Sequence, residues 1–273
     1  MQLADRHGGI IVNADSMQVY SVLDVVTARP SREDMERHPH RLYGHVHPRE
    51  AYSTGAWLRD VANLISEGVF RDRRPIFVGG TGLYFTALTR GLSEMPAVPQ
   101  AVRDRWRWRL HEEGSARLHL VLMRNDSAAA MRIQASDGQR IVRALEVLEA
   151  SGHSILFWQQ QRATPLVDLA SADAIVVEPD RDWLVRRVEA RFDWMMKQGA
   201  VEEVRVLLSL GLAPEAPAMK AIGVPEIAAA LTGAISWDEA RARAKITTRQ
   251  YSKRQATWFR TQLGPEWRRV QPG

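Results

Sequence analysis

The stretch Asn13-Ala14-Asp15-Ser16-Met17-Gln18-Val19-Tyr20 decides the fold, because it follows directly on the apolar run Gly9-Ile10-Ile11-Val12. That run is short, β-branched and uninterrupted, which is typical of a strand buried on both faces of a parallel sheet. Ligands of open α/β sheets bind just beyond the carboxyl ends of the strands, so Asp15 is expected in the binding crevice. There a carboxylate can accept a proton or orient a nucleophile. Capping of the following turn by Asp15 and Ser16 is the structural alternative.

A second strand, turn and helix are predicted in Arg74-Pro75-Ile76-Phe77-Val78-Gly79-Gly80-Thr81-Gly82-Leu83-Tyr84-Phe85. Glycines let the backbone approach an anion closely, and amides at a helix N-terminus bind phosphate. Taken alone, Gly-Gly-Thr-Gly is more often a plain strand-to-helix turn.

The composition is that of an ordinary globular protein, with 45% hydrophobic and 25% charged residues in 273. The absence of cysteine excludes disulfides and thiolate metal sites, which suits a cytoplasmic protein. No stretch approaches the ~20 apolar residues of a membrane helix, so no membrane association is expected. Charged residues at positions 5 and 6 interrupt the apolar core that a signal peptide would need.

Positive charge is concentrated near the C-terminus. The net charge is +5, from 37 basic and 32 acidic residues, but residues 241–269 hold nine Lys or Arg and only one acidic residue, Glu266. Aromatic residues are interleaved with them, including Tyr251 and Trp258. This mixture suits neutralisation of phosphates combined with stacking on bases. A solvated basic helix with its aromatic side chains packed inward is the alternative.

Two parts of the chain differ in pattern. Residues 1–101 and 166–273 alternate apolar runs with amphipathic segments, which predicts an α/β core with a crossover helix at Ser53–Ile65 and a return strand at Ala174–Val177. Residues 102–165 have a helical pattern rich in Arg and Trp, which predicts a helical insertion. Long helices are expected again from Asp182 to the end of the basic segment.

The pairs His38/His40 and His45/His47 have the spacing of metal ligands, but no carboxylate or cysteine nearby in the sequence completes a ligand set. Each pair would also fall on one face of an ordinary strand. No metal site is therefore expected in the chain's own residues.

Three segments, read together, resemble the tRNA dimethylallyltransferases (tRNA isopentenyltransferases) in order and spacing: NADSMQVY, DVVTARPS and GGTGLYFTAL. The resemblance continues through Gln139–Val147, the Arg187–Met195 segment and Lys253–Arg260, and covers nearly the whole chain. It implies a P-loop-kinase-like parallel sheet flanked by helices, with residues 102–165 as a helical insertion that contacts tRNA.

The implied reaction transfers a dimethylallyl group from dimethylallyl diphosphate to N6 of adenosine 37, beside the tRNA anticodon. The implied partners are the tRNA anticodon stem-loop and dimethylallyl diphosphate, with Mg²⁺ as cofactor and the protein as a monomer. By the same resemblance, Asp15 is the base that takes the proton from N6, and Arg191 helps to hold the diphosphate; with Thr81 they are the expected catalytic residues. The expected tRNA-binding residues are Asp15, Ser16, Met17, Gln18, Thr81, Arg103, Gln139, Arg140, Arg143, Lys220, Gly223, Lys253 and Arg254.

Structural alternatives exist for several of these residues. Met17 suits the core, and Arg103 suits the surface. Arg140 and Arg143 suit a solvated helix face, being neighbours at i and i+3. Arg191 has the alternative of pairing with a remote carboxylate. Relatives often have an aromatic residue after the glycine that matches Gly223, where this chain has Val224-Pro225, so base stacking is not expected there.

The largest departure from the family concerns the diphosphate site. Family members begin with a strand, a phosphate-binding loop of the nucleotide- and ATP-binding type, and a helix, whereas no G-x-x-x-x-G-K-[ST] occurs in these 273 residues. Residues 1–7 are similar to the end of the helix that follows the loop. The absent strand would be central, so these residues alone are expected to form an impaired enzyme. Apolar edges are expected to be exposed at Ile10–Val12 and Ile76–Val78.

Two other functions fit parts of the pattern. A P-loop enzyme that phosphorylates a small metabolite would share Asp15 and the glycine turn, but it would not need the Arg- and Trp-rich helices. A tRNA-binding protein without catalytic activity would need those helices and would not need the diphosphate site.

Overall fold

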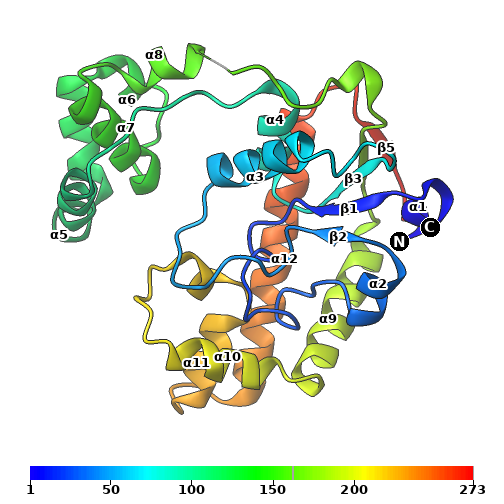
Figure 1. The fold of residues 1–273 in the computed structure, drawn as a ribbon. Helices are drawn as coiled ribbons and strands as arrows, with labels where there is room; N and C mark the ends of the chain where they lie inside the picture. The colour runs from blue at the N-terminus through cyan, green and yellow to red at the C-terminus, as the bar shows by residue number, and fades with distance from the viewer. Residues whose placement is uncertain (162, 273) are drawn as a thin grey trace. The chain divides into compact units, whose positions relative to one another are not determined.

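The structure, a computed structural model, describes residues 1–161 and 163–272; Arg162 and Gly273, which the expected domain ranges include, lie outside them. The chain divides into two compact units (Figure 1). The first comprises residues 1–89 and 167–273, and the second comprises residues 90–166. The second unit thus begins earlier than the boundary expected at residue 102.

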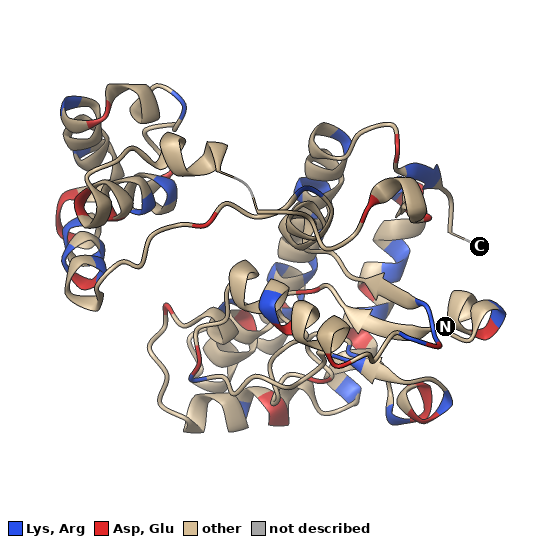
Figure 2. Cartoon of the chain, turned by 45° about the horizontal axis from the view of Figure 1, so that its top comes forward, with Lys and Arg blue, Asp and Glu red and all other residues tan. Residues whose placement is uncertain are grey.

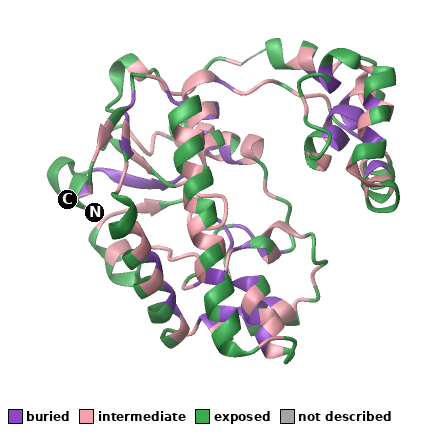
Figure 3. Ribbon diagram, turned by 180° about the vertical axis from the view of Figure 1, so that it is seen from behind, coloured by how far each residue is buried: buried purple, intermediate pink, exposed green. Residues whose placement is uncertain are grey.

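The first unit is built on a parallel sheet in the order β2-β1-β3. Strand β1 (Ile10–Asn13) pairs with β2 (His40–Arg41) on one side and with β3 (Pro75–Val78) on the other. All four residues of β1 are buried, as expected for an unbroken β-branched run, and Figure 3 shows this strand in the buried colour. The expectation of an exposed edge at Ile10–Val12 is wrong, because both edges of β1 are hydrogen-bonded.

The exposed sheet edge expected at Ile76–Val78 is present. Within the described residues β3 pairs with β1 only, and Val78 is 47% exposed. A second pair of parallel strands, β4 (Ile175–Val177) and β5 (Arg268–Val270), forms a separate two-stranded sheet. The predicted strands at Gly9–Val12, Ile76–Val78 and Ala174–Val177 are therefore confirmed.

One tryptophan joins the sheet to two helices. Helix α3 (Thr54–Ser66) begins after Ser53, whose hydroxyl accepts the amide of Ala56, and it confirms the predicted crossover helix. Its Trp57 is fully buried, stacks on Tyr84 of α4 (Gly82–Arg90) at 4.4 Å, and donates its indole N–H to the carbonyl of Asn13 at 2.7 Å. Trp57 thus fixes both helices against the carboxyl end of β1.

The remaining helices of the first unit lie mostly after the second unit in sequence. They are α1 (Gln2–His7), α2 (Arg32–Arg37), η1 (Leu169–Ser171), α9 (Arg181–Lys197), α10 (Ala200–Ser209), η2 (Pro217–Lys220), α11 (Val224–Leu231) and α12 (Trp237–Gln262). A buried cluster joins α10 and α11 to the segment after Asp15 through Val26, Val204 and Ile227, among others. The helices therefore support the turn that follows β1.

The second unit is helical throughout its described elements, as its sequence pattern predicted. Its helices are α5 (Gln100–Asn125), α6 (Ser127–Ala130), α7 (Gly138–Ser151) and α8 (Ile155–Gln160). Helix α5 is interrupted at Gly114, which has φ 77°, and Leu118 and Leu122 beyond it pack with Ile141 and Leu145 of α7. Its apolar core is separate from that of the first unit.

The two chain connections of this unit run beside each other. The amide of Val167 donates to the carbonyl of Leu88 at 3.1 Å, and the amide of Ala163 donates to that of Leu92 at 3.2 Å. The chain therefore leaves and re-enters the first unit at adjacent points. No helix among the described residues is long and apolar enough to cross a membrane.

Candidate active site

The turn after β1 is held by the amide side chain of Asn13, which is fully buried. Its Oδ1 accepts the backbone N–H of Asp15 at 2.8 Å, and its Nδ2 donates to the carbonyls of Asp15 at 2.9 Å and Leu42 at 3.0 Å. A buried amide with all these partners satisfied fixes the backbone that carries Asp15. Asn13 was not among the residues predicted for the site.

Asp15 uses its two carboxylate oxygens differently. Its Oδ1 accepts the backbone N–H groups of Met17 at 2.8 Å and Gln18 at 3.4 Å, so the capping interpretation is correct for this oxygen. No described residue donates a hydrogen bond to Oδ2, which lies beside Gly80. Asp15 is therefore anchored through one oxygen and presents the other as a free acceptor at the carboxyl end of β1, where the sequence predicted a proton acceptor.

Thr81 ties the glycine turn to the Asp15 turn. Its hydroxyl oxygen accepts the backbone N–H of Ser16 at 2.9 Å and donates to the Ser16 hydroxyl at 3.2 Å. Its own amide donates to the carbonyl of Ala14 at 3.1 Å. The Ser16 hydroxyl keeps its own proton for another acceptor. The structure thus brings together three residues that the sequence predicted for one site, Asp15, Ser16 and Thr81.

The glycines of this turn allow close packing. A Cβ at Gly79 would overlap the Ala14 backbone, one at Gly80 would overlap the Gln255 side chain, and one at Gly82 would overlap the Trp258 ring. Gln255 donates from Nε2 to the carbonyl of Gly80 at 2.8 Å, which connects α12 to the turn. Its position inside the Lys253–Arg260 segment was the available signal, but it was not predicted for the site.

Gly79→Ala should therefore be strongly destabilising. Backbone atoms at the end of β1 cannot move aside as a flexible side chain would, so we expect a loss of about 1–3 kcal/mol of unfolding free energy, the scale of overpacking. The catalytic rate should fall as well, because the clash lies next to Asp15. Gly211→Ala is the control: a Cβ there meets nothing within 4 Å, so only the backbone strain of φ 61° is added. Thermal unfolding and turnover are measured for both variants, and equal melting temperatures would contradict the packing argument.

Gln18 and Arg191 meet at one carbonyl. The Nε2 of Gln18 donates to the carbonyls of Thr27 at 2.9 Å and Ala28 at 3.0 Å, and Nη2 of Arg191 on α9 donates to the Thr27 carbonyl at 3.4 Å. Both amide protons of Gln18 are thereby used. Its Oε1, to which no described residue donates, can accept a hydrogen bond from an exocyclic amine.

The charge of Asp15 acts on several neighbouring groups. Desolvation of the guanidinium by surrounding protein lowers the pKa of Arg191, although the residue as a whole is exposed. The negative charge of Asp15 raises that pKa and so opposes the desolvation. An arginine stays charged under all ordinary conditions. Burial, followed by the charge of Asp15, raises the pKa of Tyr43, Tyr84 and Tyr251. The site therefore combines the carboxylate of Asp15, the guanidinium of Arg191 and neutral phenols.

Acidic neighbours of Arg191 on α9 have other partners. Glu189 pairs with Arg249 at 3.1 Å and Asp193 pairs with Lys245 at 2.8 Å, both on α12. Arg187 lies over the ring of Trp183 at 5.3 Å. Among the described residues Arg191 makes no ion pair with a carboxylate, so the structure does not support the alternative that it pairs with a remote one.

Helix α12 carries the predicted residues Lys253 and Arg254, both exposed. Arg254 lies over the ring of Tyr251 at 5.7 Å. Figure 2 shows Lys and Arg recurring along this helix. These two side chains are available for phosphates.

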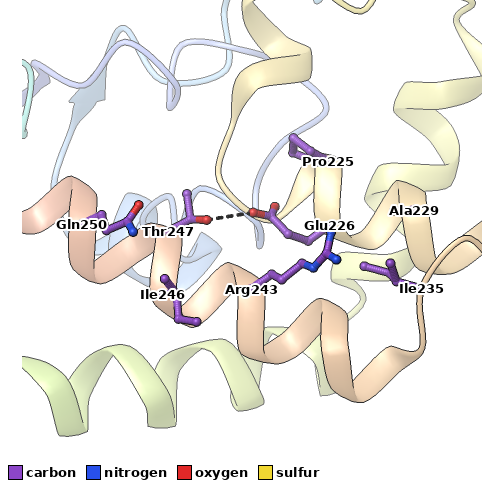
Figure 4. Close-up of a pocket in the computed structure, with 8 residues that line it drawn as sticks. All are labelled: Pro225, Glu226, Ala229, Ile235, Arg243, Ile246, Thr247 and Gln250. Carbon is purple, nitrogen blue, oxygen red and sulfur yellow. Dashed lines mark hydrogen bonds between the residues drawn. The ribbon is translucent and has the colours of Figure 1, made fainter.

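Lys220 and Gly223 lie at the turn between η2 and α11. Gly223 has φ 101°, its amide donates to Oε2 of Glu226 at 3.0 Å, and its α-carbon faces Phe192 and Val26. Glu226 also accepts the hydroxyl of Thr247 at 3.1 Å, which links the turn to α12 (Figure 4). The open hollow drawn in that figure lies between α11 and α12, and its lining includes neither Asp15 nor the glycine turn.

The other predicted tRNA-binding residues belong to the second unit. Gln139 and Arg140 are exposed on α7, and Arg140 pairs with Asp137 at 3.3 Å. Arg143 pairs with Glu146 at 3.4 Å. Arg103 of α5 is half-buried, and its Nε is buried without a hydrogen-bond partner among the described residues. The Arg140–Asp137 pair is exposed and holds its side chains only weakly, so a phosphate can displace it. The Glu146 carboxylate that pairs with Arg143 is buried.

The histidines have ordinary partners. His38 lies 2.7 Å from Asp5, and His45 lies 3.2 Å from the hydroxyl of Tyr52. His40 contacts the carbonyl of His38 at 2.8 Å. These contacts fix the loops on either side of β2.

A parallel sheet with a free carboxylate oxygen at the carboxyl end of its middle strand places the chain among α/β proteins with a strand-end site. A family model described as IPP transferase matches residues 18–262. The tRNA dimethylallyltransferase of Mesorhizobium japonicum is 63% identical over 273 residues, which cover 100% of this chain and 85% of the relative. The chain therefore belongs to the IPP transferase family.

Solved structures agree with this assignment. The full-length tRNA isopentenylpyrophosphate transferase of Bacillus halodurans matches with a TM-score of 0.68 and 30% identity, over 99% of this chain and 84% of that one. A eukaryotic dimethylallyltransferase captured acting on tRNA matches with a TM-score of 0.78 and 24% identity, over 99% and 69% of the two chains. At that identity the second match supports the fold alone.

Proposed function

We propose that the chain is an enzyme for transfer of a dimethylallyl group from dimethylallyl diphosphate to N6 of adenosine 37 in the tRNA anticodon stem-loop, giving N6-isopentenyladenosine. We further propose that these 273 residues are impaired in this reaction without a phosphate-binding loop. The observation that carries the proposal is the free Oδ2 of Asp15, fixed at the end of β1 beside Gly80. The family membership and the names of the relatives support the same reaction.

The chemistry follows from the groups present. N6 attacks C1 of the dimethylallyl group, a C–N bond forms, and the C–O bond to the diphosphate breaks with its electron pair leaving on the diphosphate. The proton lost by N6 goes to Oδ2 of Asp15. The Oε1 of Gln18 can accept a hydrogen bond from the N–H that remains on N6, and the charge of Arg191 favours the departing diphosphate.

Magnesium is part of the proposal because a leaving diphosphate needs its charge neutralised. No group of three His, Asp or Glu side chains that could hold a metal ion occurs in residues 1–161 and 163–272. These residues do not offer a metal site of their own, so no step above passes through the ion.

The second edge of β3 supports a further part of the proposal, a P-loop-kinase-like sheet. This edge has no strand partner within the described residues, and a parallel strand leading into a phosphate-binding loop would pair there. We further propose that the protein works as a monomer in the cytoplasm, where its tRNA substrate is found.

The direct test uses an anticodon stem-loop with adenosine at position 37 and dimethylallyl diphosphate, with the chain extended by a family-typical strand, loop and helix start. The nucleoside should gain one C5H8 unit, and a stem-loop with inosine at position 37 should gain none, because it lacks the exocyclic amine. Tight RNA binding without transfer would indicate a binding protein instead. Phosphorylation of a small acceptor in place of RNA prenylation would indicate a metabolite kinase.

The basic side chains give a second prediction. Arg140→Ala and Arg254→Ala should each weaken stem-loop binding and reduce the slope of log affinity against log salt by about 1, because each phosphate contact releases counterions. Arg32→Ala is the matched control: Arg32 is also exposed and pairs with Glu36 on α2. Titrations at several salt concentrations measure the slopes. Unchanged slopes in both variants would favour the solvated-face interpretation of these arginines.

A further inference from the structure

The segment 24–28 links the two halves of the proposed site. The Thr27 carbonyl accepts hydrogen bonds from both Gln18 and Arg191, at 2.9 Å and 3.4 Å. Gln18, expected at the adenine base, and Arg191, expected at the diphosphate, therefore share one acceptor. The position of this carbonyl therefore sets the separation between them.

This segment needs external support, because it is a turn outside any helix or strand. Ala28 has φ 50°, in the left-handed region that residues with a Cβ rarely adopt. Local bonds close the turn: the amide of Ala28 donates to the carbonyl of Val25, and that of Arg29 to the carbonyl of Asp24. They fix its shape but not its place relative to α9.

Glu203 supplies that support. It lies in the first turn of α10, and its Oε1 accepts the backbone N–H groups of Asp24 at 3.1 Å and Val25 at 2.7 Å, while its Oε2 accepts that of Val26 at 3.0 Å. One carboxylate thus satisfies three successive amides about 180 residues away in sequence. Burial raises the pKa of Glu203, while the three N–H groups oppose that rise.

The carboxylate acts together with apolar packing. Val26 is buried in the cluster that also contains Val204 and Leu207 of α10. Helix α10 therefore holds the segment in two ways, through the Val26 side chain and through the backbone amides of residues 24–26. The contacts of Glu203 hold the backbone of residues 24–26, directly before Thr27 in sequence. The adjacent Glu202 pairs with Arg205 at 3.2 Å on the surface and makes no such contact.

We propose that Glu203 is a positioning residue of the site: by binding the amides of residues 24–26 it sets the Thr27 carbonyl that holds Gln18 and Arg191 in register. This inference rests on the proposed function. Glu203 touches neither substrate and acts through the backbone of the segment.

A double-mutant cycle tests this. The dissociation constant of an anticodon stem-loop is measured for the full chain, Glu203→Gln, Gln18→Ala and the double variant, with active protein counted by stoichiometric titration. Glu203→Gln keeps the size of the side chain but turns one oxygen into a donor facing an amide. We expect about fivefold weaker binding, the scale of one lost hydrogen bond. The double variant should bind no more weakly than Gln18→Ala, because both changes act through one contact.

Glu202→Gln is the control, and its effect should be small and additive to that of Gln18→Ala. A lower melting temperature of Glu203→Gln with an unchanged dissociation constant would mean that Glu203 only stabilises the fold, and would overturn the inference alone. Failure of the unchanged chain to bind the stem-loop would overturn both this inference and the proposed function.

A measurement on the unchanged chain guards against misfolding of the variant. Stem-loop binding should slow hydrogen exchange at the amides of Val25 and Val26, because immobilising Gln18 restrains the segment through Thr27. Exchange at these amides that is identical with and without RNA would overturn the inference.

Discussion

Asp15→Asn should lower kcat by at least ~10²-fold, the usual scale for loss of a general base. Asparagine has the same shape, and its carbonyl oxygen can keep the hydrogen bond from the amide of Met17 that Oδ1 accepts at 2.8 Å. Its NH2 group would take the place of Oδ2 and cannot accept the proton of N6. The fold and the RNA affinity should therefore change little while the chemical step fails.

The measurement is single-turnover transfer to the stem-loop in the extended chain, with RNA affinity and thermal unfolding followed in parallel. Asp72→Asn, at an exposed position away from the turn, is the matched control and should retain full turnover. Near-normal turnover in Asp15→Asn would remove Asp15 from the mechanism. A large fall in melting temperature would show instead that the capping role of Asp15 dominates.

The 273 residues on their own should give transfer at or below the limit of detection. A leaving diphosphate needs preorganised donors, and loss of even one such donor costs ~10²–10³ in rate. No G-x-x-x-x-G-K-[ST] occurs in the sequence, and Arg191 is the only predicted diphosphate-binding residue within it. Adding a family-typical strand, loop and helix start should restore activity and should raise the melting temperature by pairing β3.

The matched control is the same extension with its loop lysine and hydroxyl residue replaced by alanine. It should restore the stability, because the strand is unchanged, but not the transfer. Rates of ~1 s⁻¹ or above for the 273 residues alone, the ordinary range for enzymes, would show that the diphosphate is held in another way.

Local pattern was sufficient to predict most of the secondary structure. The β-branched runs predicted the strands, and the helical pattern beginning at Ser53 predicted α3, which the Ser53 hydroxyl caps. The same local logic predicted a proton acceptor at Asp15 and a turn at Gly79–Gly82. These features depend on residues close in sequence, which is why a single sequence specifies them.

The contacts that complete the site depend on distant residues. Gln255 reaches the carbonyl of Gly80 across 175 positions, and Glu203 reaches Val26 across 177. Neither residue differs in type from the many Gln and Glu residues on solvated helix faces. Pairing of β2 with β1 was equally hidden, because β2 has only two residues and no apolar run. This pairing is what covers the edge of Ile10–Val12.

The adjacent connections at residues 88–92 and 163–167 have an evolutionary consequence. A segment whose ends lie side by side can be gained or lost without reopening the fold that hosts it. Residues 90–166 form a compact unit with an apolar core of their own. Segments of the helical unit away from its predicted tRNA-binding residues can thus lengthen or shorten without disturbing the strand-end carboxylate.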